Sequence, residues 1–109
     1  EIIVSSFDVS FRLIDAASVD KDKANVLLNG KTLFNKQVAG SSPLAQWTKI
    51  PLQESSNLIE IQGISSGKDG NNTATLEIRD DKTGKIQRLS LRGKQKAEKA
   101  NLIVNYLMD

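Results

Sequence analysis

The chain has 109 residues, the length of one domain, so residues 1–109 are expected to form a single domain. It lacks cysteine and histidine, which excludes disulfides, thiolate metal sites and the commonest general base. Residues 1–81 carry 8 Lys and Arg against 11 Asp and Glu, whereas residues 82–109 carry 7 against 2, so the C-terminal quarter is basic. No apolar run approaches the roughly 20 residues that span a bilayer. The chain starts with Glu1, which favours a truncated chain or a mature protein whose signal has been removed.

Apolar and polar residues alternate at every step of residues 7–13, which predicts a strand with one buried face. Its inward side chains are Phe7, Val9, Phe11 and Leu13. Asn29-Gly30 then separates two apolar runs, at 24–28 and 31–34. Because both residues tolerate positive φ, this pair predicts a type I′ hairpin.

A further strand is expected over residues 46–52, where Pro51 favours an edge position because proline donates no ladder hydrogen bond. Residues 58–62 predict another strand. Residues 73–79 alternate again and predict a strand with Ala74, Leu76 and Ile78 inward.

A turn at residues 80–84, with its glycine late, predicts a hairpin to a partner strand at 85–91. That strand carries Leu89 and Leu91 on its inner face. The tail fits either a helical stripe or a strand, and a closing strand over 101–107 is favoured because the core needs cover. About eight short strands predict an all-β fold, a two-sheet antiparallel sandwich of immunoglobulin-like or jelly-roll-like type.

Catalytic motifs are weak. Ser18-x-x-Lys21 and Ser65-x-x-Lys68 match a nucleophile motif, but both lie in polar loops with no helix after them. Asp80-Asp81 is explained by turn chemistry. We therefore predict that the chain is not an enzyme and has no catalytic residues.

Calcium is the metal ion that the side chains of this sequence could bind. Asp15, Asp20 and Asp22 lie in one expected loop, and Asp69 and Asn71 lie in another. Clustered side-chain oxygens suit this hard cation. The alternative is that these are solvated loop residues that make local turns.

Two other features bear on partners. Trp47 is either a half-buried anchor or, if exposed, a stacking platform for a glycan. The basic segment contains no aromatic residue, which disfavours nucleic acid, and is either a solvated edge or a surface for an acidic partner. Its members are Lys82, Lys85, Arg88, Arg92, Lys94, Lys96 and Lys99.

The order of these features resembles an accessory β-sandwich domain of bacterial cell-envelope and secreted proteins. The resemblance is carried by a Phe-rich strand that ends in Asp15, the Asp20-Lys21-Asp22 loop, the Leu-Asn-Gly hairpin at 28–30 and Asn-Thr-Ala at 72–74. The chain departs from that family at Lys21, where glycine is usual, and at Asn71, where proline is usual.

The resemblance implies a secreted or periplasmic location and a fold, but no reaction. We therefore predict a non-catalytic interaction or structural module. It would contact a protein partner of the cell envelope, or the rest of its own chain, through an edge strand or the basic face. The alternative is a calcium-assisted carbohydrate-binding module. No cofactor is expected unless it is calcium.

Overall fold

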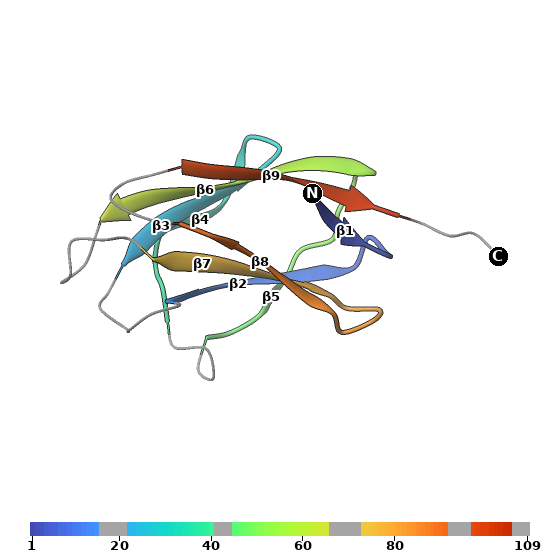
Figure 1. Cartoon of the computed structure of the whole chain (residues 1–109), viewed down its shortest axis with the longest axis horizontal. Helices are drawn as coiled ribbons and strands as arrows, with labels where there is room; N and C mark the ends of the chain where they lie inside the picture. Colours follow the sequence, from blue (N-terminus) through green and yellow to red (C-terminus); the bar gives the residue numbers. More distant parts are fainter. Residues whose placement is uncertain (16–21, 41–44, 66–72, 92–96, 106–109) are drawn as a thin grey trace.

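The computed structural model describes residues 1–15, 22–40, 45–65, 73–91 and 97–105. Within these ranges the chain is all-β, and its strands form two facing sheets (Figure 1). The predicted two-sheet sandwich is confirmed. The strands are β1 (Ile2–Val4), β2 (Val9–Asp15), β3 (Lys23–Leu28), β4 (Lys31–Val38), β5 (Thr48–Lys49), β6 (Ser56–Ser65), β7 (Ala74–Asp80), β8 (Ile86–Ser90) and β9 (Ala97–Val104).

One sheet has five strands in the order β1-β9-β6-β3-β4, and the other has four in the order β5-β2-β7-β8. Neighbouring strands are antiparallel except β1 and β9, which run parallel. In the described ranges no helix is long and apolar enough to cross a membrane.

The core lies between the sheets and follows the period of two. Val9, Phe11 and Leu13 of β2 are buried, as are the three inward residues predicted for β7. Leu91 is also buried, and Leu89 packs against the core, as predicted. Phe7 is a wrong prediction, because it is 37% exposed. It precedes the first paired residue of β2, Val9, so strand alternation does not orient it.

Strand lengths differ from the expected ones. β5 covers only two residues of the predicted 46–52 strand, but it lies at a sheet edge as predicted. β9 confirms a strand rather than a helix near the C-terminus, although it starts at Ala97 rather than at 101. Residues 106–109 lie outside the described ranges. β1 was not predicted, because three residues carry too little pattern.

The β3–β4 hairpin has the predicted turn, with φ of 53° at Asn29 and 81° at Gly30. The Asn29 side chain also links the hairpin to β6. Its Nδ2 donates to Oδ1 of Asn57 at 2.9 Å, and its Oδ1 accepts from the backbone N–H of Leu58 at 2.8 Å. One residue therefore closes the turn and fixes β6 beside it.

We expect Asn29→Ala to lower the free energy of unfolding by about 2–3 kcal/mol, since two hydrogen bonds are lost and alanine disfavours positive φ. Asn29→Gly should cost about 1 kcal/mol less, because glycine accepts this φ. Urea unfolding of both variants measures the difference. Equal losses would show that the turn conformation contributes nothing.

Asp80 ties the β1–β2 connection to the turn between β7 and β8. Its buried carboxylate accepts hydrogen bonds from the backbone N–H of Ser5 at 2.8 Å, from Ser5 Oγ at 2.7 Å and from the backbone N–H of Lys82 at 3.0 Å. Burial alone would raise the pKa of Asp80, but these donors outweigh it, so the pKa lies below its ordinary value of 3.8.

Because the folded pKa is depressed, ionised Asp80 stabilises the fold at pH values above the ordinary pKa of 3.8. This contribution is lost as the pH falls through the lower folded pKa. We expect Asp80→Asn to cost about 1–3 kcal/mol at pH 7. The gap between wild type and variant should narrow from pH 5 to pH 2, as measured by urea unfolding. A gap that is constant over this range would contradict the assignment.

Candidate functional site

An acidic side chain lies at the centre of the outer face of the four-stranded sheet. Glu77 on β7 is fully buried and is paired in register with Arg12 on β2 and Arg88 on β8. Arg12 Nε lies 2.6 Å from Glu77 Oε1, and Arg88 Nη2 lies 2.8 Å from Oε2. Two arginines on neighbouring strands thus compensate one buried carboxylate. We call these three residues the Glu77 triad.

Trp47 lies beside this triad, and its indole ring contacts two arginines. The guanidinium carbons of Arg12 and Arg79 lie 4.3 and 4.4 Å from the ring centroid. Arg79 Nε also donates to Asp81 Oδ1 at 2.9 Å, and Asp81 Oδ2 accepts from Ser10 Oγ at 2.8 Å. Trp47 is half-buried, in keeping with the anchor interpretation. A glycan would compete with these cations for the ring, and the carbohydrate alternative stays a prediction.

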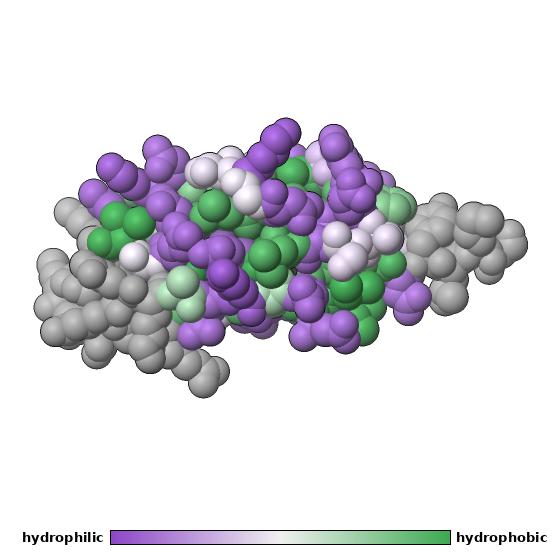
Figure 2. Space-filling view, turned by 90° about the horizontal axis from the view of Figure 1, so that it is seen from above, coloured by the Kyte–Doolittle hydropathy of each residue, from purple (hydrophilic) through white to green (hydrophobic). Residues whose placement is uncertain are grey.

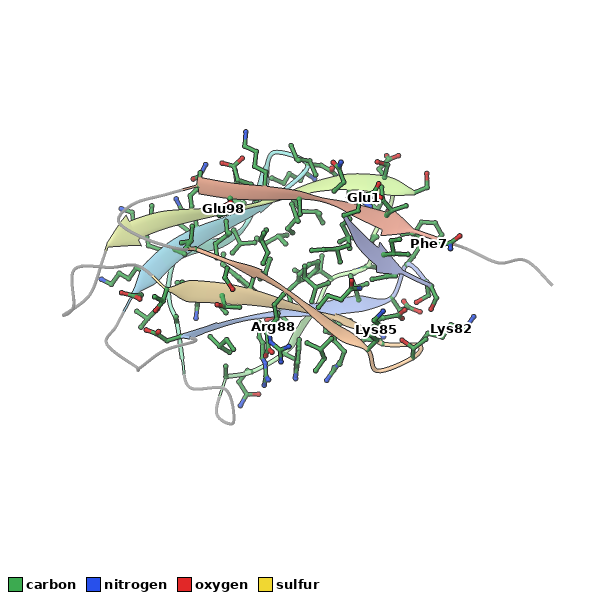
Figure 3. The ribbon with its side chains drawn as sticks, viewed as in Figure 1. Glu1, Phe7, Lys82, Lys85, Arg88 and Glu98 are labelled. Carbon is green, nitrogen blue, oxygen red and sulfur yellow. The ribbon has the colours of Figure 1, made fainter. Side chains whose placement is uncertain are left out.

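Four residues of the predicted basic segment are described, namely Lys82, Lys85, Arg88 and Lys99. The side chain of Arg88 is 58% exposed while it pairs with Glu77. Lys99 lies on β9 of the other sheet, 3.8 Å from Glu60. Arg92, Lys94 and Lys96 lie outside the described residues. Lys82 and Lys85 lie on the turn that leads into β8, before the strand that carries Arg88 (Figure 3). One cation thus lies on β8 itself, and two lie on the turn that precedes it.

Two of the predicted calcium ligands come together. Asp15 ends β2, Asp22 directly precedes β3, and both are buried. Thr73 joins them, since its Oγ lies 2.8 Å from Asp15 Oδ1 and 3.2 Å from Asp22 Oδ2. The other three predicted ligands, Asp20, Asp69 and Asn71, fall outside the described ranges. Over the described part of the chain, no three His, Cys, Asp or Glu residues form a group that could hold a metal ion.

Two open pockets lie beside β4. The larger, about 400 Å³, is lined by residues of the β3–β4 hairpin and of the 50–57 segment, and Lys31 and Glu54 are its ionisable side chains. The smaller, about 210 Å³, lies between β2 and β4, and its lining includes Arg12 and Phe34. Among the described residues no ion pair joins Lys31 to Glu54.

The outer face of the five-stranded sheet mixes polar and apolar side chains (Figure 2). Ile3 on β1 is 50% exposed and Leu58 on β6 is 43% exposed. Single exposed apolar residues are ordinary on protein surfaces, so this face does not by itself define a binding site.

Sequence reasoning missed Arg12, Glu77, Arg79 and Thr73. A signal for the first two was present: both occupy outward positions of strands with strong alternation, and opposite charges often face each other across an antiparallel pair. The register that brings them together was not readable from the sequence. Thr73 carried no signal beyond its place before the apolar run of β7.

Comparison of the chain with models of protein families, with curated proteins and with solved structures gave no match. The resemblance to an envelope accessory domain, and the secreted or periplasmic location that it implies, therefore stay predictions.

The two arginines of the Glu77 triad differ in burial, which allows a matched test. We expect Arg12→Met to cost about 3 kcal/mol, because this arginine is largely buried against Glu77 and also contacts Trp47. Arg88→Met should cost less than about 1 kcal/mol, because its side chain is mostly solvated. Denaturant unfolding of both variants is the measurement. A larger loss for Arg88→Met would overturn this ranking.

Proposed function

We propose that this domain is a non-catalytic protein-binding module, and that it takes an acidic, extended segment of a partner along the free edge of β8. The observation that carries the proposal is that no described strand pairs with the outer edge of β8, while cationic side chains lie on β8 and on the turn before it. Strand addition at such an edge uses main-chain hydrogen bonds for affinity and side chains for selectivity.

The other edges are less suited to this role. Among the described strands, β1 has three residues and β5 has two, which is too short for a stable pairing. β4 is longer, but its pairing with β3 has register shifts, and Lys36 adopts a φ of 49°. Such irregularities disrupt an edge and block strand addition. β8 has five residues paired to β7 with no register shift.

Along β8, the backbone N–H and C=O groups point alternately toward β7 and toward the outer edge of the sheet. Lys85 C=O accepts from Asp80 N–H at 2.9 Å, and Leu91 N–H donates to Ala74 C=O at 2.9 Å. In an antiparallel pair the bonded side alternates, so the odd-numbered residues bond β7 and the even-numbered residues point away. Three residues therefore turn their N–H and C=O groups outward, namely Ile86, Arg88 and Ser90.

The charge along this edge favours an acidic partner. Lys82 and Lys85 are exposed, and no acidic residue of the described ranges forms an ion pair with either. Complementary charge raises the association rate and suppresses partners of the wrong sign. The competing explanation is that charged edges prevent aggregation, which predicts no selectivity between ligands.

Fluorescence anisotropy with labelled ten-residue peptides separates these explanations. We expect an alternating Glu-Val peptide to bind at least about tenfold more tightly than a Lys-Val peptide, and added salt should weaken its binding. Equal affinity for the two peptides, or no binding of either, would rule out the proposal.

Two variants locate the surface. Lys82→Gln combined with Lys85→Gln should weaken binding of the acidic peptide by roughly tenfold, since two charges are lost at the edge. The matched control, Lys31→Gln combined with Lys36→Gln, removes the same charge from β4 and should leave binding unchanged. Ile86→Pro removes one outward N–H at the first residue of β8, where proline is tolerated, and should also weaken binding.

A further inference from the structure

The two carboxylates joined by Thr73 lie where three chain segments meet. Asp15 is in register with Ala74, the first residue of β7, and its N–H donates to the Gly40 carbonyl at 2.8 Å. The carbonyl of Asp22 accepts from the Ala39 N–H at 2.8 Å. The backbone thus fixes both acids, which are 7% and 0% exposed, at one end of the sandwich.

Hydrogen-bond donors of the described residues do not satisfy the Asp22 carboxylate. Asp22 Oδ2 accepts from the Thr73 N–H at 2.8 Å, and Thr73 Oγ lies within reach of both carboxylates but has only one proton to donate. Asp22 Oδ1 is buried and, within the described part of the chain, has no hydrogen-bond partner. A buried carboxylate oxygen without a partner is costly, and such a group calls for a specific explanation.

Asp80 is a buried acid of the same fold whose carboxylate is satisfied by hydrogen-bond donors of the chain. The donors of Ser5, Ser6 and Lys82 point at its oxygens. Asp80 and Asp22 are both buried, and they differ in the hydrogen-bond donors that reach their carboxylates.

We propose that Asp15 and Asp22 bind one Ca²⁺ ion through their carboxylates, and that Asp22 Oδ1 gains a partner in this way. Asp15 Oδ1 and Asp22 Oδ2 lie within 2.8 and 3.2 Å of one hydroxyl, and so no more than about 6 Å from each other. Ligands of one Ca²⁺ lie within about 5 Å of each other, so the two carboxylates would move closer together, with Asp22 Oδ1 turned toward Asp15, to share one ion. Water can complete the coordination shell of this cation.

The ligand atoms of this site favour some metal ions over others. The described donors are carboxylate and hydroxyl oxygens, which suit a hard cation rather than a transition metal. Ca²⁺ accepts irregular geometry, whereas Mg²⁺ demands a near-ideal octahedron. An ion here would hold the end of β2, the start of β3 and the start of β7 together, independently of the β8 edge.

Thermal unfolding of the full chain tests the site. For a Kd of about 0.1 mM, 10 mM CaCl₂ should raise Tm by roughly 10 °C relative to EGTA. Sodium chloride at equal ionic strength should have little effect. An unchanged Tm, or an equal rise with sodium chloride, would overturn the proposal, and an equal rise with MgCl₂ would overturn the assignment to Ca²⁺.

Variants assign the response to these residues. Asp22→Asn should abolish the calcium-dependent rise and, in EGTA, be at least as stable as wild type, because an unpaired buried charge is removed. Asp15→Asn should reduce the rise, which keeps the test usable if one variant fails to fold. Asp80→Asn is the matched control, since it removes a buried acid elsewhere and should retain the full rise. A full rise in both Asp22→Asn and Asp15→Asn would place the ion elsewhere.

Discussion

Every backbone N–H and C=O group of a sheet needs a hydrogen-bond partner, and an open sandwich leaves this need unmet at its edge strands. In the described part of this chain the edges are β1, β4, β5 and β8. β1 and β5 are too short to pair stably with another strand, and β4 has register shifts in its pairing with β3. β8 is left as a regular edge, and for this reason the proposed binding surface is placed there. The fold and the proposed function thus depend on the same main-chain constraint.

The Glu77 triad gives that edge a fixed register. Glu77 is buried on the outer face of β7, with an arginine in register on each side. A slip of β8 by one residue would turn Arg88 toward the apolar core and leave Glu77 without this arginine, which is far more costly than the loss of one ladder hydrogen bond. Buried ion pairs often add little stability, but here the triad specifies how β8 lies against β7. A strand held in one register is preorganised to pair with a partner.

The features that could be predicted from the sequence are those set by local pattern. Alternation identified β2 and β7 and their inward side chains, and Asn29-Gly30 identified the hairpin. Contacts between distant segments could not be predicted from local pattern. Trp47 contacts arginines of β2 and β7, and β1 pairs with β9 about 100 residues along the chain.

For the predicted calcium residues, too, local features could be predicted and contacts between distant segments could not. Composition grouped Asp15 and Asp22 in one loop, but no local pattern indicated that Thr73 would lie between their carboxylates. Phe7 shows the opposite failure, because an alternating run extended beyond the residues that pair. In both cases the missing information was the register between strands.

Hydrogen exchange of the free protein, followed by NMR at single-residue resolution, tests the free edge most directly. If β8 pairs with β7 alone, the amides of Gln87, Leu89 and Leu91 exchange slowly, whereas those of Ile86, Arg88 and Ser90 exchange fast. This alternation along β8 is the predicted result. Slow exchange at all six amides would show that another strand or a second copy already occupies the edge, and would contradict the account.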